Sequence, residues 1–261
     1  MSQSVKCLHL PPALAFYDAI VDADQGEGVA VLFGNYAGDN MNVKMAVQMA
    51  EDDDIEVKYV VANDDVASAP KAVKEQRHGI AGGFFMWKVG GARAAKGGSL
   101  DDVIASAQNV VNRTKSICVG LEPCVIPALG HSNFKIEDGT MEFGVGHHGE
   151  AGTKVEKLKS ASEMAQEMAE TILNDFDFEE GKEVAVMLSG LGATPVMELY
   201  VLYDEVEKVL AKAGHKVWKT YIGNYVTSLD MNGASLTIVD LDDEIKELLS
   251  EPAVPIGMKN Y

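Results

Sequence analysis

The sequence predicts an α/β protein with two domains. Short apolar runs rich in β-branched residues alternate with longer segments whose apolar residues recur at helical spacing, a pattern typical of a mostly parallel sheet covered on both faces. After Thr114 the sequence pattern changes, because a hairpin signal appears in addition to those for strands and helices. We therefore expect a three-layer α/β/α domain with a mostly parallel sheet over residues 1–114 and a second α/β domain with a mixed sheet over 115–261.

The first domain is predicted to open with a helix followed by a strand, a turn and another helix. Apolar spacing favours a helix over 13–23, after Pro12. GVAVLF at 28–33 is typical of a buried strand, GNYAGD at 34–39 of a tight turn, and a Met-rich helix follows over 40–50. In open α/β sheets ligands bind at the carboxyl ends of strands, so this turn is a candidate site.

One further strand and two helices complete the first domain. IEVKYVVA predicts a strand over 55–62, and the polar residues 63–65 indicate a turn or helix cap. The glycine-rich segment 79–95 predicts a helix whose glycines allow close approach of its neighbours. Ser99 is expected to cap a helix over 100–113.

The second domain is predicted to contain a hairpin, four other strands and three helices. The hairpin pairs 134–136 with 141–145 around Glu137-Asp138-Gly139, a turn signal. The other elements are strands over 116–121, 184–188, 217–222 and 235–239 and helices over 160–174, 195–213 and 242–250.

Composition narrows the class of protein. The chain has 261 residues, and its 40 acidic and 22 basic side chains give a formal charge of −18, which disfavours nucleic acid and anionic membranes as partners. No apolar run approaches the roughly 20 residues of a membrane span, and no signal peptide is evident. Cys7, Cys118 and Cys124 lack CxxC spacing and fit a reducing compartment, so we expect a cytoplasmic protein.

The stretch MEFGVGHHGEAG, residues 141–152, is the strongest candidate site. Its glycines leave room for a small ligand to approach the backbone, and His147 and His148 fall where a strand opens into a loop. The residues alone leave three interpretations open. The histidines are solvated or core residues; they bind a metal with Glu150 and His131; or His148 captures a carbonyl covalently.

Three further motifs each have a simple structural explanation. Asp39 closes GNYAGD and is either a helix cap or a general base that accepts a proton from a substrate hydroxyl. GLGATP at 190–195 is too short for a phosphate-binding fingerprint, and Thr194 in it is best explained as part of a strand-to-helix turn. Residues 227–230, TSLD, are most simply a polar loop between strands.

Taken together and in this order, GNYAGD, GVGHHGEAG, GLGATPVMELY and TSLDMNG resemble the K subunit of dihydroxyacetone kinase from about Pro12 onward. The resemblance implies a two-domain α/β subunit, usually a homodimer, that holds a small ketone as a covalent hemiaminal on His148. It implies that Asp39 is the catalytic aspartate and that Gly34 lies at a substrate-contacting position where some members have lysine. His147 falls where the family varies.

The resemblance also implies how the subunit acts. Phosphoryl transfer to the terminal hydroxyl of dihydroxyacetone gives dihydroxyacetone phosphate, with ADP or ATP and magnesium on a separate L subunit and, in phosphotransferase-linked systems, an M subunit that relays phosphate. This chain itself is expected to bind no metal or nucleotide. The alternatives are a non-catalytic ketone-binding coactivator and a kinase for a related short ketose such as erythrulose.

One departure concerns the first residues. Family members carry a GGGSGHEP-like loop ahead of the matched region, which contributes substrate contacts and a second histidine. Residues 1–10 do not resemble this loop, and His9 sits in no such motif. We therefore expect a first domain that is incomplete at its N-terminal side.

Overall fold

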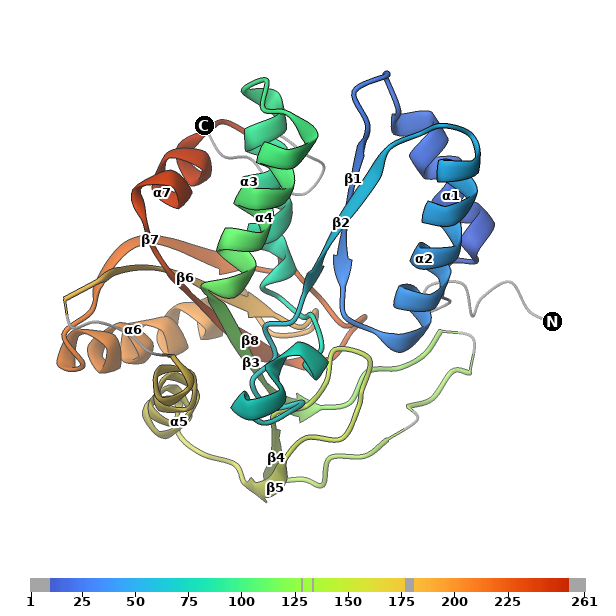
Figure 1. The fold of residues 1–261 in the computed structure, drawn as a ribbon. Coiled ribbons are helices and arrows are strands. Elements are labelled where there is room, and N and C mark those ends of the chain that lie inside the picture. Colours follow the sequence, from blue (N-terminus) through green and yellow to red (C-terminus); the bar gives the residue numbers. More distant parts are fainter. Residues whose placement is uncertain (1–9, 128, 133, 177–180, 254–261) are drawn as a thin grey trace.

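Two β-sheets with helices packed on their faces make up the fold in the computed structural model (Figure 1), which describes residues 10–127, 129–132, 134–176 and 181–253. One sheet is parallel and the other is mixed. The predicted α/β fold with two domains is confirmed. The segment before residue 10, which includes Cys7 and His9, lies outside the described residues.

The parallel sheet pairs β1 (Val29–Gly34) with β2 (Val57–Ala62) and is the middle layer of three. On one face its apolar side chains pack with α1 (Ala13–Ala23) and α2 (Ala37–Asp52). On the other face they pack with α3 (Gly83–Ala95) and α4 (Leu100–Asn112). The layers are seen edge-on in Figure 1.

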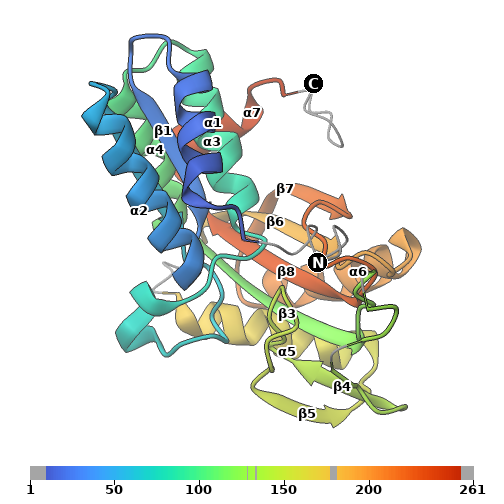
Figure 2. The same cartoon turned by 90° about the vertical axis from the view of Figure 1, so that its right-hand side faces the viewer.

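The mixed sheet has the strand order β5-β4-β3-β8-β6-β7, in which the β6–β7 pair is parallel and the other pairs are antiparallel. Figure 2 shows its strands in one curved layer. The strands are β3 (Thr114–Glu122), β4 (Thr140–Phe143), β5 (Lys154–Lys157), β6 (Glu183–Gly190), β7 (Lys216–Gly223) and β8 (Asn232–Asp240). The helices after β5, β6 and β8 are α5 (Ala161–Asp175), α6 (Val196–Lys212) and α7 (Asp243–Ser250).

Alternate residues of β6 face opposite layers of helices, as the period of two in a strand requires. Val186 and Leu188 pack with α5 and α6. Ala185 and Met187 belong to a second core that includes residues of α3, α4, α7 and β2. The layer of α3 and α4 therefore contacts both sheets. The mixed sheet begins at Thr114, and the division of the chain into domains there stays a prediction.

Helices α4 and α5 begin with serine caps, and the one at Ser99 was predicted. The Ser99 hydroxyl accepts a hydrogen bond from the backbone of Asp102 while the Asp102 carboxylate accepts one from the Ser99 backbone, and Ser160 forms the same arrangement with Glu163. Such reciprocal pairs satisfy backbone donors that the first helical turn leaves free. The predicted bounds of most helices and strands differ from the structure by only a few residues.

The predicted hairpin is wrong. Strand β4 pairs with β3 and β5, and residues 134–136 join neither strand. Met141 and Phe143 are buried against the apolar β3, whereas Phe134 packs into a separate cluster with Val145 and Leu191. The helix predicted over 79–95 begins only at Gly83.

A buried ion pair fixes the segment before this helix. Both terminal guanidinium nitrogens of Arg77 donate to the Asp175 carboxylate at 2.7 Å, and the Arg77 Nε donates to the Ala69 carbonyl at 2.8 Å. Only 1% of the Arg77 side chain is exposed. Because a buried charge without a partner is costly, this contact holds the 3-10 helix Lys71–Gln76 and the residues after it against α5.

Candidate functional site

The GNYAGD turn joins β1 to α2 and carries the first group of site residues. Strand β1 ends at Gly34, and α2 begins at Ala37, so Asp39 lies in the first helical turn and not at the cap position, which Tyr36 occupies. The cap interpretation of Asp39 is therefore wrong. A carboxylate in the first turn still interacts favourably with the helix dipole.

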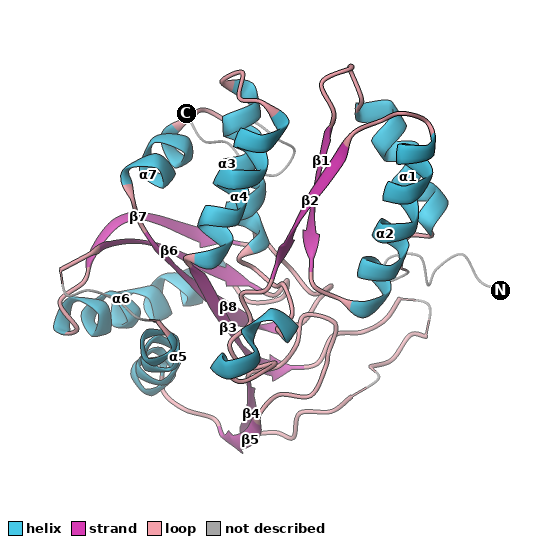
Figure 3. Ribbon diagram, in the orientation of Figure 1, coloured by secondary structure: helices cyan, strands magenta, loops and turns pink. Residues whose placement is uncertain are grey.

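Contacts to backbone groups hold this turn against the segment before α3. The Asn35 side-chain amide donates to the carbonyls of Arg77 at 2.6 Å and Glu75 at 3.0 Å. A Cβ on Gly79 would lie 2.8 Å from the Cα of Gly34, so glycine is required for this approach. Figure 3 shows loops gathered below the ends of β1 and β2, where these segments meet.

Residues 144–152, here called the histidine loop, follow β4, as predicted. Gly144 and Gly149 adopt positive φ angles of 76° and 80°, which a residue with a side chain rarely adopts. The Glu150 carboxylate accepts a hydrogen bond from the backbone N–H of His148 at 2.8 Å. Its other oxygen lies 3.5 Å from the His148 Nδ1. Glu150 therefore contacts both the backbone and the ring of His148.

These contacts favour a proton on the ring nitrogen of His148 that faces Glu150. Burial would raise the pKa of Glu150, but hydrogen bonds from the His148 side chain and from the backbone hold that pKa at about 2. Glu150 is thus an anion at neutral pH. A proton on Nδ1, the nitrogen that faces Glu150, would leave the lone pair of the His148 ring on Nε2.

The histidine loop lies against the GNYAGD turn. The His148 ring meets the Tyr36 ring edge-on at 4.7 Å between centroids, and 45% of the His148 side chain is exposed. Burial raises the pKa of Asp39, and the nearby His148 imidazole opposes this rise. The structure therefore brings His148 and Asp39, from different domains of the predicted fold, within electrostatic reach of each other.

His147 has a different environment. Burial, followed by the neighbouring His148, lowers the pKa of His147 to about 4, while Glu150 and a hydrogen bond with the backbone of Thr227 act in the opposite direction. His147 is therefore neutral near pH 7 and ties the histidine loop to the loop before β8. This loop is the TSLD stretch that the sequence places between strands.

The hypothesis that the histidines bind a metal is not supported by the described residues. Within the described ranges, no three or more His, Cys, Asp or Glu side chains gather as metal ligands would. His131 Nδ1 instead hydrogen-bonds the carbonyl of Ser132 at 2.9 Å, on an exposed stretch. His131, His147, His148 and Glu150 thus do not form a metal centre among the residues described.

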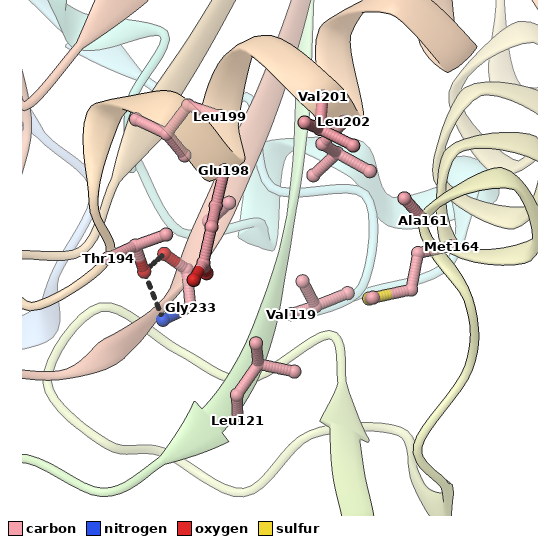
Figure 4. Close-up of a pocket in the computed structure, with 11 residues that line it drawn as sticks. Val119, Leu121, Ala161, Met164, Thr194, Glu198, Leu199, Val201, Leu202 and Gly233 are labelled. Carbon is pink, nitrogen blue, oxygen red and sulfur yellow. Dashed lines mark hydrogen bonds between the residues drawn. The ribbon is translucent and has the colours of Figure 1, made fainter.

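Thr194 is structural, as expected. Its hydroxyl donates to the Gly233 carbonyl at 2.6 Å and accepts from the Gly233 N–H at 2.8 Å, which joins the GLGATP turn to the start of β8. The residue also lines an apolar cavity of about 210 Å³ between the mixed sheet and helices α5 and α6 (Figure 4). His148 and Asp39 are not among the residues that line this cavity.

The comparison with protein families decides the identity. A family model described as the Dak1 domain matches residues 9–256, nearly the whole chain. The chain belongs to the Dak1 family. This confirms the resemblance that the four motifs carry.

Two of the named relatives of this Dak1 chain are a kinase subunit and a kinase. The dihydroxyacetone-binding subunit DhaK of PTS-dependent dihydroxyacetone kinase 1 from Listeria innocua is 41% identical over 87% of this chain and 69% of that relative. D-erythrulose kinase from Mycolicibacterium smegmatis is 37% identical over 88% of this chain and 40% of its own length. These names place the chain in a family of phosphotransferases.

A solved structure shares the fold closely. The dihydroxyacetone kinase operon co-activator Dha-DhaQ has a TM-score of 0.87 and 29% identity, covering 93% of this chain and 75% of that one. Separately, no helix in the described part of this Dak1 chain is long and apolar enough to cross a membrane.

Sequence reasoning missed three side chains near the site. Tyr36 lies inside GNYAGD, and its ring stacks on that of His78 at 4.9 Å between centroids. Asp65, read from the sequence as part of a polar turn, is buried beside the equally buried Asp64. Asp64 accepts hydrogen bonds from the backbone N–H groups of Ile80 and Gly82, but its burial was not visible in a run of three polar residues.

Asp65→Asn is expected to stabilise the protein at neutral pH. Burial, followed by the carboxylates of Asp64 and Glu150, raises the pKa of Asp65 to about 7 from an ordinary value of 3.8. The folded state then binds the proton of Asp65 more tightly than the unfolded state does. Ionisation of Asp65 therefore lowers the stability of the folded state as pH rises from 3.8 to about 7. Thermal unfolding at pH 4 and pH 8 measures the effect.

At pH 8 the variant should melt a few degrees higher, on a scale of roughly 2–4 °C per kcal/mol for a chain of this size, and at pH 4 the difference should vanish. Asp22→Asn, on the exposed side of α1, is the matched control. Equal melting temperatures of Asp65→Asn and the parent protein at pH 8 would contradict the burial argument.

Proposed function

We propose that this chain is the ketone-binding subunit of a dihydroxyacetone kinase. It captures dihydroxyacetone as a hemiaminal on His148 and presents the terminal hydroxyl for phosphorylation, which gives dihydroxyacetone phosphate. The observation that supports this most is the placement of His148, oriented by Glu150, against the turn that carries Asp39. The name of the Listeria innocua relative supports dihydroxyacetone as the ligand.

Capture is an addition reaction. The Nε2 lone pair of His148 forms a bond to the carbonyl carbon, the C=O π pair moves to oxygen, and that oxygen takes a proton from solvent. No group leaves. The positive charge that remains on the imidazole faces the Glu150 anion. A ketone can undergo this addition and glycerol cannot, which separates two molecules that noncovalent contacts distinguish poorly.

Phosphoryl transfer follows in this proposal. Asp39 accepts the proton of the terminal hydroxyl as the phosphoryl group arrives, and its burial favours this role because a raised pKa makes a carboxylate a better base. Gly34 contributes a backbone contact to the substrate. A side chain at this position would crowd the Gly79 carbonyl oxygen, which would lie only 3.1 Å from its Cβ.

The phosphoryl donor is proposed to be supplied by other subunits. ADP or ATP and magnesium bind to a separate L subunit, and in phosphotransferase-linked systems an M subunit relays phosphate to it. The DhaK relative's designation as the dihydroxyacetone-binding subunit of a PTS-dependent kinase supports this division of labour. We further propose a cytoplasmic homodimer.

Dihydroxyacetone labelled with ¹³C at the carbonyl tests the proposal. On mixing with the protein, NMR should show a new protein-bound signal outside the carbonyl range, since addition makes that carbon tetrahedral. Labelled glycerol should give no bound signal. A bound ketone that keeps its carbonyl signal would show that the site binds without covalent capture and would overturn the hemiaminal.

A second candidate is a ketone-binding coactivator without turnover. The TM-score of 0.87 to a co-activator favours keeping it. Adding an L subunit with its phosphoryl donor separates the two, because the coactivator would capture ketone without producing a phosphate ester. Offering erythrulose beside dihydroxyacetone in the same assay tests whether the substrate matches that of the D-erythrulose kinase relative.

A further inference from the structure

Tyr36 connects the two halves of the proposed site. It occupies the N-cap position of α2, three residues before Asp39, and its ring contacts two histidines from different segments. The His78 ring stacks on it with an interplanar angle of 18° and the His148 ring meets it edge-on at 61°. Stacked and edge-on contacts are the arrangements that aromatic rings prefer, so these contacts favour one position of each ring.

The other contacts of the His148 ring come from its own loop, and Tyr36 contacts the ring from a different segment. Glu150 lies 3.5 Å from Nδ1, and the His147 ring lies at 5.5 Å between centroids. Both belong to the same loop as His148 and would move with it. Tyr36 is the ring contact that comes from the β1–α2 turn, and it therefore relates the orientation of His148 to the turn that holds Asp39.

The Tyr36 hydroxyl does not explain why this ring is in place. The oxygen is buried and has no hydrogen-bond partner among the described residues. The carboxyl groups of Glu150, Asp65 and Asp64 are near enough to act on it. A buried hydroxyl without a partner destabilises a fold, so packing of the ring, and not a hydrogen bond, holds Tyr36 where it is.

We propose that Tyr36 is a positioning residue for His148. Its ring keeps the imidazole in the orientation in which Nδ1 faces Glu150 and Nε2 is free, and it acts through ring contact without need of its hydroxyl. The catalytic consequence rests on the proposed function, because a free Nε2 is what ketone capture requires. The orientation itself is a property of the ligand-free protein.

Three variants test the claim on the full chain. Tyr36→Phe keeps the ring, Tyr36→Leu removes it, and Tyr59→Leu removes a tyrosine of β2 that contacts Phe33 and not the histidines. NMR of ¹⁵N-histidine-labelled protein without ligand reports which His148 nitrogen carries the proton. The rate of capture of carbonyl-labelled dihydroxyacetone is measured in parallel.

Tyr36→Phe and Tyr59→Leu should match the parent protein in both measurements. Tyr36→Leu should shift His148 toward a mixture of tautomers and slow capture by roughly 100-fold, the scale on which small misplacements of a reacting group act. If Tyr36→Leu does not fold, Tyr36→Gln replaces it. General loss of packing in Tyr36→Leu would not by itself change the tautomer of His148. A tautomer that changes in Tyr36→Leu and is normal in Tyr36→Phe therefore points to the ring contact.

Two outcomes would overturn the inference. A Tyr36→Phe variant that behaves like Tyr36→Leu would assign the effect to the hydroxyl, and an unchanged His148 tautomer in Tyr36→Leu would show that Glu150 alone orients the ring. If the parent protein captures no ketone, the proposed function fails, but the tautomer measurement on ligand-free protein still decides the positioning role.

Discussion

His148→Gln is expected to abolish covalent capture of dihydroxyacetone and to reduce turnover by at least about 1,000-fold, the order of loss when an enzyme loses its covalent nucleophile. Glutamine has no lone pair that adds to a ketone, yet it keeps a polar side chain of similar length. Because 45% of the His148 side chain is exposed, the fold should tolerate this change. The carbonyl-carbon NMR signal and phosphate-ester production with an added L subunit measure the two losses.

His131→Gln is the matched control for this variant. It replaces another exposed histidine of the same half of the chain, whose ring hydrogen-bonds the Ser132 carbonyl. It should keep both capture and turnover. Persistence of the bound tetrahedral signal in His148→Gln would show that a different group holds the ketone.

Asp39→Asn is expected to separate capture from phosphoryl transfer. The ketone should still add to His148, but turnover should fall by about 10²–10⁴-fold, because an amide cannot accept the hydroxyl proton. Since burial raises the pKa of Asp39, the acid limb of the parent enzyme's pH–rate profile should lie above the ordinary range of an aspartate, and the substitution should remove that limb.

Asp52→Asn, at the opposite end of α2, controls for the loss of a charge from the same helix. It should leave both steps unchanged. Removing a carboxylate from the first turn of α2 costs about 0.3–1 kcal/mol of stability through the helix dipole, too little to explain a large loss of turnover. An Asp39→Asn variant with full turnover would rule out the base.

The sequence predicted the elements around the site well, because periodicity and capping act locally. The helix over 13–23 has the predicted bounds, and the strand, turn and helix at GNYAGD occur in that order. His148 and Asp39 were found through their motifs. Their proximity came from the resemblance, since no local pattern specifies which loops of two sheets meet.

The predictions that were wrong or missing concern contacts between segments that are distant in the sequence. The turn signal at Gly139 is real, with a φ of 74°, but β4 gains more by pairing with the buried β3 than with residues 134–136. Residues 79–82 carry a helix-like pattern, yet the buried Asp64 carboxylate binds the backbone of Ile80 and Gly82 and keeps the segment out of the helix. The ring contacts of Tyr36 were hidden because its partners, His78 and His148, lie far along the chain.

Helices α3 and α4 lie between the two sheets and share one apolar core with both. Neither half can be pulled away without baring that layer to water, so the protein should melt in one cooperative step instead of domain by domain. A ligand that seals the junction between the GNYAGD turn and the histidine loop would then protect the entire molecule against heat, including strands that never touch it.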